Sequence, residues 1–246
     1  MSSTFTLFRD IVVDLIDRIV TEENRNLEKA AELIADAFIK DGFLYVFGTG
    51  HSMIVALEMF YRAGGLVRVY PLFDISLSPL GGALRSTSLE RIQGYAKAIL
   101  DSVPIKPNSV MIIVSASGKN TVPIEMALEA RKRGLKVIAI TSVSYSRSVA
   151  PSNPWGKKLF DLADVVIDSK VPRGDAVYKV EGFEQAVAPV STILNSFIVQ
   201  AIVARVVEKL IDKGIEPEVW MSVNVPGGME RNEELLRKYI TLIKPL

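Results

Sequence analysis

The chain of 246 residues contains no cysteine, and its only histidine is His51. Without cysteine it can form neither disulfides nor thiolate metal sites, and it has no cysteine nucleophile. A single histidine also argues against a transition-metal site, because imidazole and thiolate are the ligands that such metals favour. We therefore expect no bound metal. The absence of cysteine is consistent with a cytoplasmic location, which we also expect.

An excess of one charge and a long apolar run are also missing. The 29 Lys and Arg residues nearly balance the 28 Asp and Glu residues and form no basic run, so no nucleic-acid surface is indicated. Arg9, Asp10 and Asp14 interrupt the first apolar residues, and we therefore expect no signal peptide. Polar residues such as Asn195 and Arg205 interrupt the longest apolar stretch, which predicts a helix buried in protein and no membrane contact.

The first 41 residues carry two apolar stripes at helical spacing, in residues 8–19 and 27–38. Polar residues 21–24 lie between the stripes and predict a break, and hence a pair of amphipathic helices. Each stripe must be buried, either on the rest of the chain or on a second subunit in a four-helix contact. The N-terminal helical pair (residues 1–41) is therefore a candidate for dimerisation.

From residue 42 onward, predicted strands alternate with predicted helices. The expected strands are 43–47, 66–70, 110–114, 136–140 and 164–167, and the expected helices are 53–62, 88–100, 122–133, 189–213 and 230–243. This alternation predicts an α/β fold with three layers, a doubly wound parallel sheet with helices on both faces. No linker divides the chain, so we expect a single domain (residues 1–246) with an α/β core and C-terminal helices in residues 42–246.

The central predicted strand, residues 110–114, is followed by a turn rich in hydroxyl groups. Ser115 and Ser117 are followed by Gly118, Asn120 and Thr121, and then by a helix. The N-terminus of a helix offers unpaired N–H groups and a favourable dipole, which suits a phosphate group. The other interpretation is that the serines close the strand and that Asn120 or Thr121 merely caps the helix.

A second turn of similar composition, Gly48 to Ser52, follows the first predicted strand. In parallel sheets, ligands bind at the carboxyl ends of strands where the strand order reverses. If the two strands are neighbours at that point, both turns face one crevice, which favours a ligand over simple capping. Met53 takes the place of the last glycine of a dinucleotide fingerprint, and neither a P-loop nor a Gly-x-Ser-x-Gly motif is present. We therefore expect no nucleotide cofactor.

Three stretches together resemble the sugar isomerase (SIS) domain family. They are residues 47–65, residues 115–127 with their Ser-x-Ser-Gly turn, and residues 174–177 with 189–192. The resemblance covers nearly the whole chain and is closest to uncharacterised proteins related to phosphoheptose isomerase. It implies a five-stranded, flavodoxin-like or Rossmann-like parallel sheet, homodimers or dimers of dimers with shared active sites, and phosphorylated sugars as ligands.

The same resemblance implies roles for the residues of the two turns. Ser115 and Ser117 match the serines that bind the sugar phosphate in SIS domains, and Asn120 replaces a usual threonine, with Thr121 beside it. Thr49 or Ser52 of the first turn should add another hydroxyl group.

The resemblance also gives candidates for catalysis. Phosphoheptose isomerases and related etherases carry a catalytic glutamate ten residues after the serine of the first turn, where this chain has Arg62. Glu184 matches the Glu-x-x-Val-Ala segment in which the isomerase domain of glucosamine-6-phosphate synthase carries its glutamate. The alternative for Glu184 is a solvated loop carboxylate.

His51 and Glu58 are further candidates on the segment that follows the first strand. His51 could assist ring opening or hold a sugar hydroxyl, or it could make only a structural hydrogen bond. Glu58 could contact the sugar or act as a base, or it could form an ordinary ion pair with Arg62, four residues further along a helix.

Two functions remain open at this stage. The first is an isomerase that moves a proton between neighbouring carbons of a sugar phosphate through an enediolate, for which one carboxylate suffices. The second is a non-catalytic protein that binds and senses a sugar phosphate. Arg62 favours the second function, whereas Glu184 and His51 favour the first.

Overall fold

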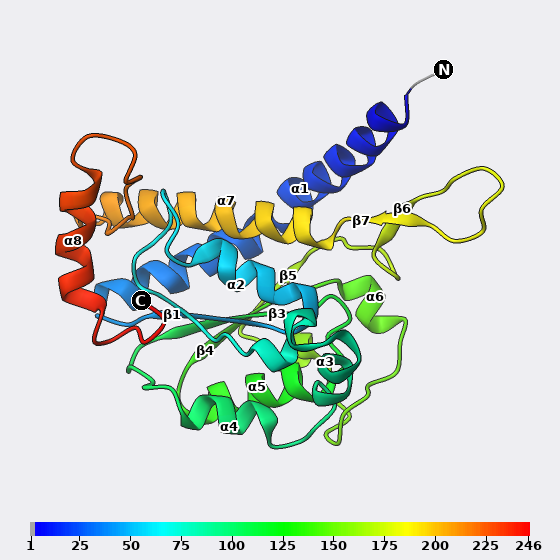
Figure 1. Ribbon diagram of the computed structural model, residues 1–246, viewed down its shortest axis with the longest axis horizontal. Helices are drawn as coiled ribbons and strands as arrows, with labels where there is room; N and C mark the ends of the chain where they lie inside the picture. Colours follow the sequence, from blue (N-terminus) through cyan, green and yellow to red (C-terminus); the bar gives the residue numbers. More distant parts are fainter. Residues whose placement is uncertain (1–2) are drawn as a thin grey trace.

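The computed structural model describes residues 3–246 and contains a central parallel sheet (Figure 1). Its strands are β1 (Leu44–Gly48), β2 (Val69–Pro71), β3 (Val110–Val114), β4 (Lys136–Thr141) and β5 (Val165–Asp168). All neighbouring pairs are parallel and the strand order is β2-β1-β3-β4-β5. The predicted five-stranded, doubly wound parallel sheet is therefore confirmed.

The strand order reverses between β1 and β3, which lie side by side. Their register pairs Leu44 with Val110 and Gly48 with Val114, so both strands end at the same level. Every residue of both strands is buried, as expected for apolar strands covered on both faces. The turns that follow β1 and β3 consequently begin next to each other at the carboxyl edge of the sheet.

Helices cover both faces of the sheet. They are α1 (Thr4–Ile39), α2 (Met53–Met59), α3 (Ala83–Leu89), α4 (Tyr95–Asp101), α5 (Thr121–Lys132), α6 (Val143–Arg147), α7 (Ser191–Asp212) and α8 (Gly228–Tyr239), with short 3-10 turns at 50–52, 75–77, 79–81 and 159–161. One buried core joins α1, α2 and α7 to the sheet, and the other joins α4, α5 and α8 to its opposite face. Figure 1 shows the same division, with α1, α2 and α7 above the sheet and α4 and α5 below it.

The predicted break in the N-terminal helical pair is wrong, because α1 is one continuous helix of 36 residues. The polar residues 21–24 contain neither proline nor glycine, so nothing in the backbone stops the helix there. Glu23 is only 7% exposed and faces inward, although it is charged. The polar segment therefore marks a buried ion cluster on the helix.

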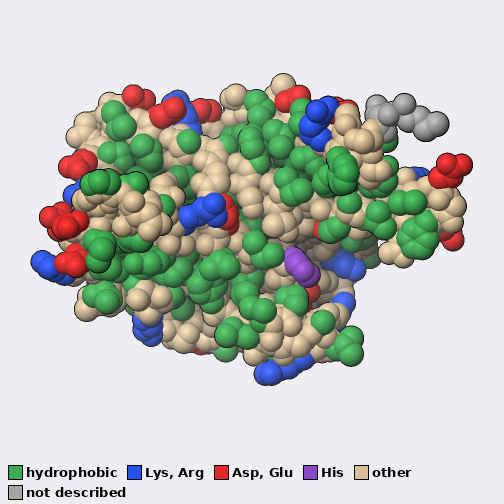
Figure 2. All heavy atoms as spheres, turned by 45° about the horizontal axis from the view of Figure 1, so that its top comes forward, with side chains coloured by type: hydrophobic (Ala, Val, Ile, Leu, Met, Phe, Trp, Pro, Cys, Tyr) green, Lys and Arg blue, Asp and Glu red, His purple; other side chains and the backbone are tan. Residues whose placement is uncertain are grey.

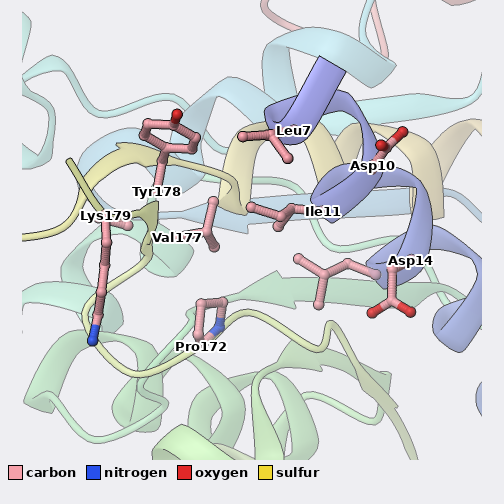
Figure 3. Close-up of a pocket in the computed structure, with 10 residues that line it drawn as sticks. Leu7, Asp10, Ile11, Asp14, Pro172, Val177, Tyr178 and Lys179 are labelled. Atoms are coloured by element: carbon pink, nitrogen blue, oxygen red, sulfur yellow. The ribbon is translucent and has the colours of Figure 1, made fainter. Parts of the chain in front are cut away.

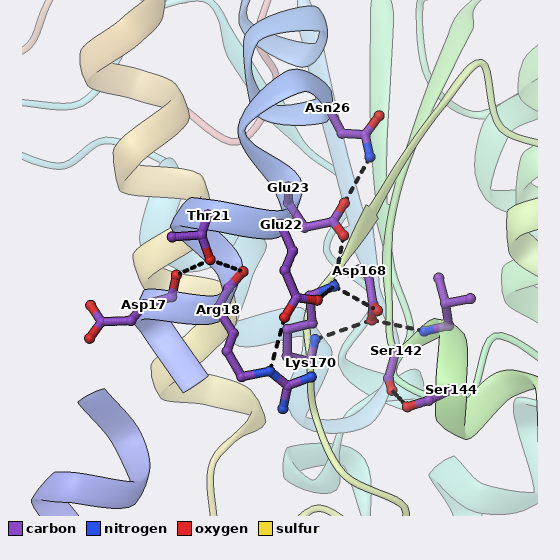
Figure 4. Close-up of polar contacts among 11 residues, drawn as sticks. Asp17, Arg18, Thr21, Glu22, Glu23, Asn26, Ser142, Ser144, Asp168 and Lys170 are labelled. Carbon is purple, nitrogen blue, oxygen red and sulfur yellow. Dashed lines mark hydrogen bonds and ion pairs between the residues drawn. The ribbon is translucent and has the colours of Figure 1, made fainter. Parts of the chain in front are cut away.

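That cluster joins α1 to the end of β5 (Figure 4). The Lys170 ammonium group lies 2.8 Å from Glu23, 2.9 Å from Glu22 and 3.1 Å from Asp168, and the Lys170 side chain is only 7% exposed. Burial alone would lower the pKa of Lys170, but hydrogen bonds to Glu23, Glu22 and Asp168 outweigh it and raise this pKa. We call these four residues the Lys170 cluster.

Two further segments differ from the prediction. The helix expected over residues 88–100 is divided into α3 and α4, and the buried Glu125 accepts hydrogen bonds from the backbone N–H groups of Gly94 and Ala96 at the start of α4. The stretch before α7, expected to be irregular, contains the antiparallel hairpin of β6 (Ala176–Tyr178) and β7 (Val187–Pro189). Figure 1 shows this hairpin, here called the arm, projecting from the body of the molecule.

Within residues 3–246 no helix is long and apolar enough to cross a membrane. The same part of the chain contains no group of three or more His, Cys, Asp and Glu side chains that could hold a metal ion.

Candidate functional site

The turn after β1 folds tightly back against the end of its strand. A Cβ atom on Gly48 would lie 2.4 Å from the carbonyl oxygen of Ser52, so only glycine fits at that position. The Thr49 hydroxyl is buried and donates a hydrogen bond of 2.5 Å to Oε1 of Glu90. The Ser52 side chain is half-buried and makes no hydrogen bond with residues 3–246.

The turn after β3 is held by contacts within the sheet and by a neighbouring loop. The Ser115 hydroxyl is buried and accepts a hydrogen bond of 3.2 Å from the N–H of Gly118. The Thr121 hydroxyl donates to the carbonyl of Ser152 at 3.3 Å. Asn120 precedes α5 without capping it, and its Oδ1 is buried without a partner in the described chain. The capping interpretation of Asn120 and Thr121 is therefore not supported by their contacts.

Several donors of this second turn remain free. Across residues 3–246, the backbone N–H groups of Ser117, Lys119 and Asn120 have no hydrogen-bond acceptor, and the half-buried Ser117 hydroxyl has no partner either. Free N–H groups grouped in a turn before a helix suit an anion, although the N–H of Gly118 between them is occupied by Ser115. Because β1 and β3 are neighbours, the structure places Thr49, Ser52, Ser115, Ser117, Asn120 and Thr121 at one edge of the sheet.

Replacing Gly118 by alanine should distort this turn. Gly118 has a φ of +52°, and a Cβ atom there would lie 2.9 Å from Oγ1 of Thr141 and 3.1 Å from Cβ of Leu159. The matched control is Gly134→Ala, because Gly134 has a φ of +81° with nothing within 4 Å of the added atom. Both changes carry the left-handed backbone cost, and the collision should add about 1–3 kcal/mol at Gly118. Urea denaturation of the two variants measures this difference in the free energy of unfolding. If both variants lost the same free energy of unfolding, the close packing of this turn would be contradicted.

The structure ties Glu58 to neighbouring side chains. Its carboxylate forms an ion pair with Arg62 and accepts a hydrogen bond of 2.9 Å from Nε2 of Gln200 on α7. The ion-pair alternative for Glu58 is therefore present, and the hydrogen bond from Gln200 joins α2 to α7.

The other two candidates for catalysis are exposed. Glu184 lies on the arm and makes no hydrogen bond or ion pair with any of residues 3–246. Figure 2 shows His51, the only histidine, on the surface beside a hollow. Within one copy of the chain, the structure thus brings His51 to the two turns and leaves Glu184 on the projecting arm.

Glu90 is the carboxylate that joins the two turns. Its side chain accepts the Thr49 hydrogen bond, and its backbone carbonyl accepts a hydrogen bond of 3.0 Å from the N–H of Val122 at the start of α5. Its half-buried side chain forms no ion pair with the described residues. A carboxylate held in this position can take up and return a proton beside a ligand that the turns bind.

Comparison with known proteins agrees with the motifs of both turns. The model of the SIS domain matches residues 7–142, which include both turns and Glu90. The chain belongs to the SIS domain family.

The chain also has relatives that match more than nine tenths of its length. A UPF0309 protein of Brucella anthropi is 45% identical over 229 residues, covering 92% of this chain and 93% of the relative. A UPF0309 protein of Listeria innocua is 40% identical over 230 residues, covering 94% and 93%. The solved phosphoheptose isomerase of Neisseria gonorrhoeae has the same fold, with a TM-score of 0.54, 17% identity, and coverage of 85% of this chain and 97% of that one.

One cavity of this SIS domain protein lies away from the two turns (Figure 3). It has a volume of about 730 Å³ and lies between the first half of α1 and the base of the arm, lined by residues such as Leu7, Ile11, Val177 and Tyr178. None of the predicted site residues lines it. Its lining is mainly apolar, and its two carboxylates, Asp10 and Asp14, outnumber its one cation, Lys179, which does not favour a phosphate.

Sequence reasoning missed Glu90 as a site residue. In the sequence Glu90 lies 41 positions after Thr49 and within a stretch that reads as an ordinary amphipathic helix. Glu90 reaches both turns only because the chain after β2 passes back across the carboxyl edge of the sheet. No motif that we recognised in the sequence indicates that return.

Proposed function

We propose that this SIS domain protein binds a phosphorylated sugar and isomerises it. The phosphoryl group binds at the turn between Ser115 and Thr121. The observation that carries this proposal is the set of free donors there, namely three backbone N–H groups and the Ser117 hydroxyl in front of α5. A dianionic phosphate accepts several such hydrogen bonds and is further stabilised by the dipole of a 12-residue helix. Ser52 of the first turn supplies another free hydroxyl group.

In the proposed reaction on an aldose phosphate, a carboxylate removes the proton from C2 to give an enediolate and returns it to C1. The proton of the O2 hydroxyl group passes to O1, so the carbonyl group moves from C1 to C2. Glu90 is placed for this role within one copy of the chain, because its carboxylate touches the first turn and its backbone touches the helix after the second. His51, exposed in the turn after β1, would hold a sugar hydroxyl or assist ring opening. Proton transfer by one positioned carboxylate contributes a rate factor of about 10²–10⁴.

Glu184 is the competing base, and it would require a second copy of the chain. The arm that carries it projects from the body and exposes Val180, Phe183 and Val187. A hairpin of two strands is only marginally stable alone in water, so we propose that the arm packs in a homodimer or a dimer of dimers. In such an assembly Glu184 would enter the partner's crevice.

The alternative function is a sensor that binds a sugar phosphate without reaction. The ion pair between Arg62 and Glu58 favours it. Arg62 stands where related isomerases carry a catalytic glutamate, and its positive charge neutralises Glu58, the candidate base on α2. Binding is common to both functions, so it is tested first.

Binding should appear as thermal stabilisation by phosphorylated sugars. A hexose or amino-sugar phosphate at 100 times its dissociation constant should stabilise the protein by about 2.7 kcal/mol, whereas the neutral sugar should have no effect. Ser117→Asp should abolish the stabilisation, because its carboxylate would repel the phosphoryl group. Ser102→Asp, on an exposed residue after α4 and before the start of β3, is the matched control and should retain it. Equal responses of the two variants would contradict the proposed site.

A further inference from the structure

A buried lysine without a counter-charge lies against the phosphate-binding turn. Lys158 is 7% exposed, and its ammonium group donates a hydrogen bond of 2.6 Å to the carbonyl of Val149. No carboxylate among residues 3–246 forms an ion pair with Lys158 or with the half-buried Lys119 of the turn. Asp161, the nearby acid, accepts instead from the backbone N–H of Lys158 at 2.8 Å.

Lys170 provides an internal comparison. Its side chain is largely buried as well, but three carboxylates surround it, and their hydrogen bonds raise its pKa against the effect of burial. Burial and repulsion by Lys119 lower the pKa of Lys158, and the charge of Asp161 only partly opposes this. A buried charge is costly unless it is paired. The chain thus surrounds one buried ammonium group with three carboxylates and leaves the other without an ion pair, with only partial compensation by Asp161.

The segment that carries Lys158 is fixed to the turn by several hydrogen bonds. The N–H of Leu159 donates to the carbonyl of Gly118 at 3.0 Å, and the N–H of Ser152 donates to the carbonyl of Lys119 at 3.0 Å. Nδ2 of Asn153 donates to the same carbonyl of Lys119 at 2.9 Å. These hydrogen bonds fix the segment that carries Lys158 to the turn, and the charge of Lys119 in the turn acts on the Lys158 ammonium group.

We propose that Lys119 and Lys158 supply the counter-charge for a dianion bound at this turn, and thereby select phosphate esters over neutral or singly charged sugars. This inference rests on the proposed function, because it assigns the charge selectivity of the same site. The two lysines act as positioning residues through their electric field. The missing anion of Lys158 is the phosphoryl group of the ligand.

Calorimetric titration with inorganic phosphate and with glucose 6-phosphate tests the proposal. Lys158→Met should weaken both dissociation constants by at least about tenfold, and Lys158→Arg, which keeps the charge, should restore most of the affinity. Lys157→Met is the matched control, because Lys157 is exposed on the same segment. The affinity of this variant for both ligands should stay within about twofold of wild type. Without ligand, Lys158→Met should unfold at the same temperature as wild type or higher, since it removes an unpaired buried charge.

The outcomes separate this inference from the proposed function. Wild-type affinity in Lys158→Met would overturn the role of Lys158 while leaving the phosphate site intact. A large loss of stability in ligand-free Lys158→Met, with phosphate affinity unchanged, would show that its hydrogen bond to Val149 is its only role and would also overturn the inference. Absence of binding in the wild-type protein would overturn the proposed function, and this inference with it.

Discussion

Glu90→Gln should slow the exchange of the sugar C2 hydrogen with deuterated solvent by about 10²–10⁴-fold. Glutamine can still accept the hydrogen bond from Thr49, so the turns should keep their geometry, but an amide cannot act as the base. Affinity for the sugar phosphate should therefore change little. Exchange is measured by NMR with a panel of hexose and amino-sugar phosphates in deuterated water.

Two parallel variants decide between the carboxylates. Glu184→Gln tests the base on the arm, and Glu181→Gln, also exposed on the arm, is its control. If exchange is lost in Glu184→Gln and kept in Glu90→Gln, the base belongs to the arm and Glu90 only positions Thr49. If the wild-type protein binds the sugar phosphates but exchanges no hydrogen, the sensor function stands instead.

Lys170→Met should cost about 3 kcal/mol of folding free energy, because breaking a buried ion pair leaves an uncompensated charge. Removal of the ammonium group would leave the carboxylates of Glu23 and Asp168, whose side chains are 9% and 18% exposed, without their shared cation. Lys179→Met is the control, since Lys179 is exposed on the arm, and its effect should stay within about 0.5 kcal/mol. The midpoints of urea denaturation give both values.

The alkaline pH dependence of this effect follows from the raised pKa of Lys170. Unfolded lysine loses its proton around pH 10.5, and the native group holds its proton to higher pH. The contribution of Lys170 is therefore complete below pH 10.5 and is lost as the pH rises through the native pKa. The difference between wild type and Lys170→Met should be constant from pH 8 to about 10. A loss similar to that of Lys179→Met throughout this range would contradict the role given to the cluster.

The sheet could be predicted because its signal is local. Runs of β-branched and apolar residues such as Val110–Val114 indicate buried strands, and the turns that follow them contain the glycines that a close return of the chain requires. The neighbourhood of the two turns also followed from the rule that ligand crevices form where the strand order reverses. For this reason the sequence could predict that the two turns lie side by side.

The errors have a common cause in contacts between distant residues. Residues 21–24 predicted a break in α1 because they are polar. Their carboxylates instead bind the ammonium group of Lys170, which lies 147 positions after Glu23. Glu90 and Lys158 reach the turns through returns of the chain that leave no periodic pattern in the sequence. A single sequence shows that a residue is polar, whereas the fold decides whether it faces water, an ion or a ligand.

The most direct test of the account is a crystal structure of the protein with glucose 6-phosphate or another hexose phosphate that stabilises it. The account predicts electron density for the phosphoryl group against the N–H groups of Ser117, Lys119 and Asn120, with the sugar extending toward Thr49 and Glu90. Density for the ligand in the cavity between α1 and the arm, with the turn empty, would contradict it.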